Sequence, residues 1–184
     1  MRELYEAIRA GDAARVRAAV EADPGLAIFA AAMQGNAAET EALLTGNRSL
    51  VGATSVDGWT PLHLASHFGR ADVVRILINK GAEVEARSAN AMANTPLHAA
   101  AAGRSVEVAR LLMERGASPN ARQNGGWTPL HAAAQNGDAD FARALVDAGA
   151  DVNIRADNQQ TPLDLALTRS QQAMVELLES LGAK

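Results

Sequence analysis

The sequence predicts an all-α protein in which about six short helix pairs stack side by side. Three observations support this fold class. Thr-Pro-Leu occurs four times, at Thr60, Thr95, Thr128 and Thr161, and so returns at nearly even intervals. Gly-Ala follows each of these threonines at one constant distance. The chain is 48% hydrophobic but only 3% aromatic, with 41 alanines, which suits closely packed helices rather than a β-sandwich.

We interpret residues 1–184 as a single domain, because one helix pair of this size cannot bury its apolar face alone and must pack on its neighbours. The predicted units are an N-terminal capping helix pair (1–24), a degenerate repeat (25–56), three typical repeats (57–91, 92–124 and 125–157) and a C-terminal capping repeat (158–184).

Positions 1–54 show the pattern only weakly. Gly11 and Gly35 align with the glycine that lies nine residues after a repeat threonine, and they predict the first two helix pairs. The second pair begins unusually soon after the first, through Asp23-Pro24-Gly25, which leaves no room for a longer loop. A first repeat with altered sequence is expected for a cap.

In a typical repeat, threonine is a good N-cap and proline fits the first helical turn, so Thr-Pro predicts the start of a short inner helix. Gly69 and Gly137 end that helix in their repeats. Apolar residues then recur at helical spacing, as at Val73, Val74 and Leu77, and predict an outer helix that ends at Gly-Ala. The stretch before the next threonine is polar and rich in turn residues.

Several positions depart from this pattern. The loop before Thr95 is two residues longer than the others. Ala93 and Gln159 stand where the other loops have glycine, and Arg104 stands where the inner helix of its repeat should end in glycine. The last predicted helix, roughly residues 171–181, has a polar outer face, so we expect a C-terminal cap, a complete chain and a monomer.

Composition excludes several classes of function. The net charge is −4, without a basic segment, so the chain lacks the basic excess of a duplex-binding protein. There is no cysteine, which excludes disulfides and thiol catalysis. The charged N-terminus is not a signal peptide, and no apolar stretch is long enough to span a membrane, so we expect a cytoplasmic protein. Arginine outnumbers lysine 15 to 2, which, with the many alanines, points to a bacterial source.

The sequence carries no recognisable catalytic motif: no phosphate-binding glycine loop, nucleophile elbow or metalloprotease helix occurs. His63, His98 and His131 occur once per repeat, on helices about 8–10 Å apart, and this is too far for shared coordination of one metal. We therefore expect no catalytic residue, no cofactor and no metal site.

The 33-residue period, with Thr-Pro-Leu-His followed by Gly-Ala, resembles the ankyrin repeat over roughly residues 55–184. The resemblance implies short β-hairpins between the helix pairs, and histidines that hydrogen-bond to threonine and backbone groups between repeats. It also implies a protein partner that is held on a concave face formed by the hairpin tips and the ends of the inner helices.

The resemblance assigns candidate contact residues one position at a time. The hairpin positions are Trp59, Met92, Asn94, Trp127 and Gln160, and the inner-helix ends are His67, Phe68, Gln135 and Asn136. Tryptophan is a typical hot-spot residue, so our hypothesis is that Trp59, Phe68, Met92 and Trp127 form the apolar centre of the binding face. The alternative is that each tryptophan folds down onto its own hairpin and helix, and that His67 is simply solvated.

Arginine recurs six residues after the start of Gly-Ala, at Arg87, Arg122 and Arg155. Such a column can meet an acidic partner segment or phosphates, or it can be neutralised by nearby acidic side chains. The function we predict is non-catalytic protein–protein recognition. The alternatives are an inhibitor or antitoxin-like partner of an enzyme, nucleic-acid or phosphate binding through the arginine column, and a purely structural role.

Overall fold

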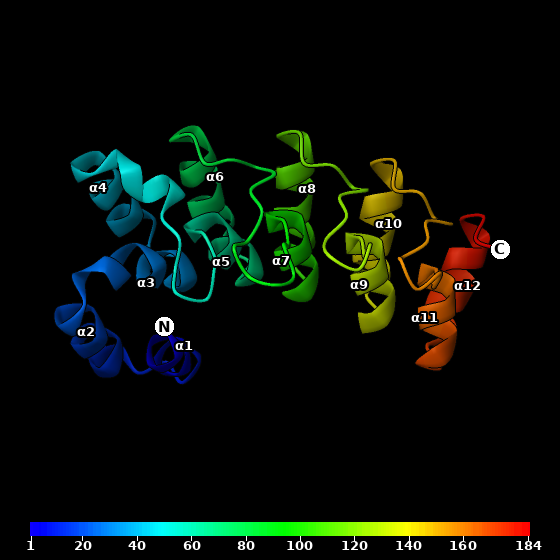
Figure 1. Ribbon diagram of the computed structural model, residues 1–184, viewed down its shortest axis with the longest axis horizontal. Coiled ribbons are helices and arrows are strands. Elements are labelled where there is room, and N and C mark those ends of the chain that lie inside the picture. Colours follow the sequence, from blue (N-terminus) through cyan, green and yellow to red (C-terminus); the bar gives the residue numbers. More distant parts are fainter.

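The computed structural model describes residues 1–184 and contains twelve α-helices and no β-strand. The helices form six successive pairs, which confirms the predicted all-α stack, and Figure 1 shows them from the N-terminal (blue) to the C-terminal (red) end. Two 3-10 turns, η1 (Pro24–Leu26) and η2 (Arg48–Gly52), precede α3 and follow α4. The helices are α1 (Arg2–Arg9), α2 (Ala13–Ala22), α3 (Ala27–Gln34), α4 (Ala37–Gly46), α5 (Pro61–His67), α6 (Ala71–Asn79), α7 (Pro96–Ala102), α8 (Val106–Glu114), α9 (Pro129–Asn136), α10 (Ala139–Asp147), α11 (Pro162–Thr168) and α12 (Gln172–Ser180).

The inner helices α5, α7, α9 and α11 all begin in the same way. Thr60 is extended (φ −84°, ψ 164°) and caps α5, and Pro61 occupies the first helical position, where no backbone N–H is needed. The third helical residue then accepts a hydrogen bond from the threonine N–H. This acceptor is His63, His98, His131 or Asp164. The recurring capping box explains why the Thr-Pro pairs mark the helix starts so reliably.

The inner helices approach one another closely at their C-terminal ends. Gly69 and Gly137 end α5 and α9 in the left-handed conformation, at φ 67° and 65°. In α7 that conformation falls on Arg104 (φ 57°), while Gly103 keeps a helical φ of −83°. A Cβ atom at Gly103 would lie 1.8 Å from the carbonyl oxygen of His67 on the neighbouring repeat. The displaced glycine is therefore required by contact between helices and not by the turn.

The connecting loops reverse direction as hairpins do, but only one backbone hydrogen bond joins the two ends of each loop, a second lies within its turn, and none contains a strand. In the shorter loops this bond joins Ser55 to Trp59, Gln123 to Trp127 and Ala156 to Gln160, each at 2.9 Å. The longer loop closes from Ser88 to Asn94 at 2.8 Å. The expected β-hairpins are therefore present as tight turns and not as strand pairs.

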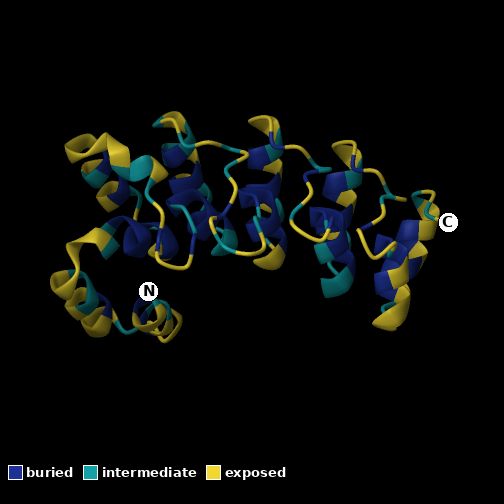
Figure 2. Cartoon of the chain, viewed as in Figure 1, coloured by how far each residue is buried: buried dark blue, intermediate teal, exposed yellow.

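Between the inner and outer helices lies one continuous apolar core, dark blue in Figure 2. Leucines such as Leu62, Leu97 and Leu130 are fully buried. Alanine fills the same inner-helix position in every repeat and is also fully buried. These alanines are Ala7, Ala31, Ala65, Ala100, Ala133 and Ala166. Small side chains at these positions allow neighbouring pairs to pack closely, which accounts for the composition.

The first helix pair does not continue the row. In Figure 1, α1 and α2 lie below α3, outside the row of the later pairs. The ring of Tyr5 in α1 lies 5.3 Å from the ring of Phe68 at the end of α5, in an edge-to-face arrangement. Pair one thus contacts pair three as well as pair two. Only the short η1 turn joins the first pair to the second, whereas longer loops join the later pairs.

Candidate functional site

The three Thr-Pro-Leu-His histidines form a chain of hydrogen bonds that links successive repeats. Nδ1 of His98 accepts from Thr95, at 2.9 Å from its hydroxyl oxygen. Nε2 of His98 donates to the carbonyl oxygen of Trp127 in the next repeat, at 3.1 Å. The same arrangement joins His63 to Asn94 and His131 to Gln160. The backbone of three predicted hairpin positions is therefore fixed by histidines, as the resemblance implies.

These hydrogen bonds between repeats require neutral histidines, because the Nδ1 atom of each must remain an acceptor. Burial lowers the pKa of His98 to about 4, although the carbonyl group of Trp127 partly opposes this. Burial lowers the pKa of His63 and His131 in the same direction. In the last repeat the residue is Asp164, whose carboxylate accepts hydrogen bonds from the backbone N–H and the hydroxyl group of Thr161. The histidines thus act as structural bridges.

Two hollows lie on the face formed by the loops and the inner helices. The Trp127 hollow has a volume of about 440 Å³ and lies between α7, α9 and the loops that precede them. Four of the predicted contact residues meet there: Met92, Asn94, Trp127 and Gln135. The Trp127 ring is half-buried and lies 5.5 Å from the ring of His131. Trp127 therefore packs on its own helix and still lines an open hollow.

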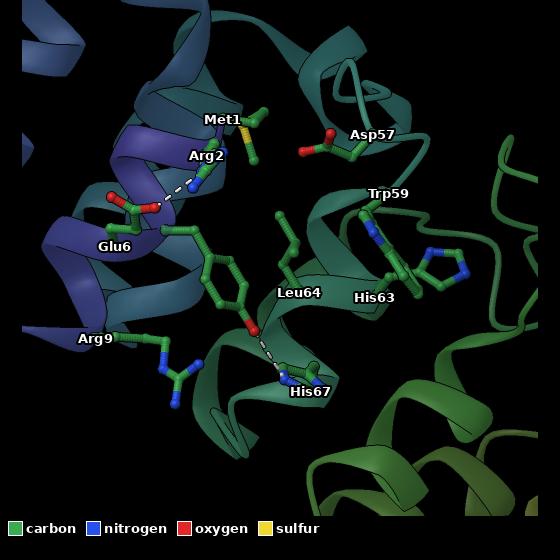
Figure 3. Close-up of a pocket in the computed structure, with 10 residues that line it drawn as sticks. Met1, Arg2, Glu6, Arg9, Asp57, Trp59, His63, Leu64 and His67 are labelled. Atoms are coloured by element: carbon green, nitrogen blue, oxygen red, sulfur yellow. Dashed lines mark hydrogen bonds and ion pairs between the residues drawn. The ribbon is translucent and has the colours of Figure 1, made fainter.

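The second hollow, the Trp59 hollow, has a volume of about 460 Å³ and is shown in Figure 3. One wall comes from the loop and from α5, through Asp57, Trp59, His63, Leu64 and His67. The other wall consists of Met1, which directly precedes α1, and of a single face of α1 formed by Arg2, Tyr5, Glu6 and Arg9. Trp59 is half-buried, with its ring 5.4 Å from that of His63. Each tryptophan thus packs against its own inner helix and also lines a hollow on the face of the loops and inner helices, so both arrangements that the sequence left open apply.

The Trp59 hollow is closed at one end by a contact between α1 and α5. The hydroxyl group of Tyr5 hydrogen-bonds to Nε2 of His67 at 3.1 Å, which Figure 3 marks with a dashed line. Burial lowers the pKa of His67, and the positive charge of Arg9 lowers it further, while a hydrogen bond to the carbonyl group of Ala99 opposes them. His67 thus hydrogen-bonds to α1 through Tyr5 and is only partly exposed.

A family model described as "Ankyrin repeats (3 copies)" matches residues 4–88, 28–123, 87–156 and 120–184. These overlapping matches cover nearly the whole sequence, including positions 1–54, where the repeat pattern is weak.

The chain belongs to the ankyrin repeat family. Ankyrin repeats are generally protein–protein interaction modules and are typically not catalytic. No three histidine, cysteine, aspartate or glutamate side chains lie close enough together to bind a metal ion. None of the helices has the length and apolar composition that crossing a bilayer requires.

The arginine column of the ankyrin stack is engaged in internal hydrogen bonds. Arg87 donates to the carbonyl groups of Ala93 and Arg122. Arg122 donates to the carbonyl group of Arg155 at 3.0 Å and to the carboxylate of Asp157 at 3.1 Å. Arg87 and Arg122 thus connect their own loops to the next one. Arg155 donates within its own loop, to the carbonyl group of Gln159. Part of the hydrogen-bonding capacity of these guanidinium groups is therefore taken up by contacts within the stack.

The remaining predicted contact residues lie outside both hollows. Phe68 packs edge-to-face on Tyr5, so it supports α1 rather than joining the two tryptophans. The side chain of Asn136 donates to the carbonyl group of Ala101 at 3.3 Å, and that of Gln160 accepts from Asn158 at 2.6 Å.

Sequence reasoning missed the α1 wall of the Trp59 hollow. It placed α1 in line with the inner helices, as a cap. One signal in the sequence bears on this. The interval from Gly11 to Gly35 is clearly shorter than that from Gly35 to Gly69, so the first pair cannot be joined to the second by a loop of the usual length. Tyr5, the only tyrosine of the chain, aligns with the repeat histidines but hydrogen-bonds to His67 instead.

Proposed function

We propose that this protein recognises a protein partner, without catalysis, through the concave face that carries the Trp59 and Trp127 hollows. The observation that carries the proposal is that two half-buried tryptophans, at equivalent loop positions two repeats apart, each line a hollow on that face. Tryptophan is strongly enriched among residues that dominate binding energy, because it offers a large rigid surface and one N–H donor. Membership of the ankyrin repeat family supports the same proposal.

The test compares two double variants as bait for proteins from the native host. In the first, Trp59→Ala is combined with Trp127→Ala. In the control, Arg110→Ala is combined with Arg143→Ala, which changes two exposed side chains on the outer helices α8 and α10. We expect the wild type and the control to retain the same partner and the tryptophan variant to lose it. A partner retained by the tryptophan variant would contradict the proposal.

Thermal unfolding of the tryptophan variant separates lost recognition from lost structure. Both side chains are half-buried, so we expect about 1–3 kcal/mol of destabilisation and a protein that is still folded at the temperature of the binding experiment.

A further inference from the structure

The two hollows differ in their chemistry. None of the eleven residues that line the Trp127 hollow is an acidic residue, a lysine or an arginine, and four of them are amides: Asn94, Gln123, Asn124 and Gln135. A charged side chain buried there would lose hydration without gaining an opposite charge. The Trp59 hollow has an apolar lining of Met1, Tyr5, Trp59 and Leu64, with charges of both signs around it. The Trp127 hollow therefore favours an uncharged side chain, and the apolar lining of the Trp59 hollow favours an apolar one.

The loops offer no free backbone edge for strand addition beside these hollows. The amide of Ala89 donates to the carbonyl oxygen of Gly58 at 2.8 Å, and that of Asn124 donates to Met92 at 2.9 Å. The amide of Asp157 donates to Gly125 at 3.0 Å. Because successive tips are already joined in this way, a partner cannot bind mainly through main-chain pairing and must insert side chains.

A partner helix does not fit between α1 and α5. Two packed helices need about 8–10 Å between their axes, and a third helix would need that distance on both sides. Tyr5 of α1 instead contacts α5 directly, with its hydroxyl group 3.1 Å from His67 and its ring 5.3 Å from that of Phe68. A single side chain can still enter this hollow beside Trp59.

The spacing of the hollows sets the spacing of the inserted side chains. Trp59 and Trp127 are two repeats apart, which corresponds to roughly 16–20 Å at about 8–10 Å per helix. An extended chain advances about 3.3 Å per residue, so about five or six residues span this distance.

We propose that the partner presents an extended segment with two uncharged anchor side chains about five or six positions apart, one apolar anchor in the Trp59 hollow and one neutral anchor in the Trp127 hollow. This inference rests on the proposed function and specifies the partner's chemistry. Met92 is 48% exposed on the loop between the two tryptophan loops, where it lines the edge of the Trp127 hollow and offers an apolar surface to the segment between the anchors.

The probe is a display library of random peptides of about 16 residues, selected against the wild-type protein, since this length spans both hollows with residues to spare. The expected result is an enriched pattern with two uncharged, mainly apolar or aromatic, positions five or six apart. A single anchor, a charged anchor, helical spacing of the anchors or no enrichment would overturn the inference.

Two variants then assign each anchor to its hollow. Trp59→Ala should weaken the selected peptide at least about tenfold and remove the preference at one anchor only. Ala102→Glu adds a charge to the Trp127 hollow from an exposed position at the end of α7, so it leaves the core unchanged and should remove the preference at the other anchor. Arg110→Glu, on the outer face of α8, is the matched control and should not alter binding.

The two proposals can fail separately. If the tryptophan double variant still loses its whole-protein partner while selected peptides lack the paired anchors, the concave face binds proteins but not through an extended two-anchor segment. If both variants leave the peptide affinity unchanged, the hollows are not where the peptide binds, and the inference is wrong.

Discussion

At the scale of single residues, the stack depends on histidines that must stay uncharged. His98 is 4% exposed, accepts hydrogen bonds from Thr95 and donates one to the carbonyl group of Trp127. Protonation of Nδ1 would place an N–H group against the N–H group of Thr95 and break the link. Trp127 and Asn94 thus have two roles: the carbonyl group of each accepts a hydrogen bond from the preceding repeat, and the side chain of each lines the Trp127 hollow.

The lowered pKa of His98 predicts loss of stability in acid. Since the folded-state pKa, about 4, lies below the ordinary value of 6.5, the unfolded chain binds the proton first as the pH falls. The contribution of His98 to the free energy of unfolding is then fully present above about pH 7. It declines between pH 6.5 and about 4, by about 3 kcal/mol in total. Urea unfolding measured across this range should show the decline.

The control for this prediction is His98→Gln, which cannot titrate. Its stability at neutral pH should be lower, because the two hydrogen bonds by which His98 links Thr95 to the carbonyl group of Trp127 are disturbed. Its decline between pH 6.5 and 4 should be visibly shallower than that of the wild type, and an unchanged slope would show that other groups cause the acid sensitivity.

At the scale of helices and loops, neighbouring repeats are held at a fixed separation by close contacts. Gly103 at the end of α7 leaves no room for a side chain beside the carbonyl group of His67. Glu85, Asn120 and Asn153, which occupy equivalent positions four residues after the repeat glycines, each bond to the following repeat. The separation of the inner helices, and so of the two hollows, follows from these contacts.

Gly103→Ala should therefore destabilise the protein, although alanine is the better helix former. The added Cβ would lie 1.8 Å from the carbonyl oxygen of His67, so α5 and α7 must move apart at a cost of about 1–3 kcal/mol. Thermal or urea unfolding would measure this. Gly46→Ala in α4, where nothing lies within 4 Å, is the matched control and should be neutral or slightly stabilising. Equal effects of the two variants would argue against the steric explanation.

The position of α1 depends strongly on Tyr5. Tyr5→Ala removes the edge-to-face contact with Phe68 and the hydrogen bond to His67, and should make local opening of residues 2–22 easier by about 1–2 kcal/mol. Hydrogen exchange should become faster in α1 and α2 and remain unchanged from α7 to α12. Tyr5→Phe keeps the ring and should have a smaller effect. Uniformly faster exchange along the chain would contradict a local role for Tyr5.

At the scale of the whole molecule, charge contributes little to the proposed recognition. The four ion pairs are formed by exposed or partly exposed side chains, and the arginine column donates to loop carbonyl groups. We expect partner affinity to change less than about threefold between roughly 0.05 and 0.5 M salt, because apolar anchoring is weakly screened. A steep fall in affinity, measured by titration calorimetry, would instead assign the binding to Arg87, Arg122 and Arg155.

Much of the fold could be predicted because its signals are local and repeated. Thr60-Pro61 and its three equivalents determine helix starts within a few residues, and the Gly-Ala pairs follow the outer helices. The placement of α1 could not be predicted in this way, since it depends on contact between Tyr5 and Phe68, which are far apart in the sequence. The short interval from Gly11 to Gly35 indicates that the first pair departs from the row, but it does not indicate which residues α1 contacts.

The candidate site was predicted only in part, for a related reason. Loop positions identified Trp59, Met92, Asn94 and Trp127 as neighbours of an exposed face, because repeats carry backbone positions over directly. Side-chain directions are not carried over. Phe68 packs on Tyr5 of α1, a contact that no other repeat has. The arginine column points into the loops, because its guanidinium groups donate to loop carbonyl groups such as that of Arg155.

The turn of the first helix pair restricts how this protein can change by duplication of its repeats. A repeat copied into the chain after α7 would lengthen the row and leave α1 against α5. A repeat copied between α4 and α5 would move His67 and Phe68 away from Tyr5 and dismantle one hollow. Units can therefore be added or lost in the C-terminal half without disturbing the contact between α1 and α5, although the spacing of the two hollows would change, whereas the first three pairs must stay adjacent to keep this contact.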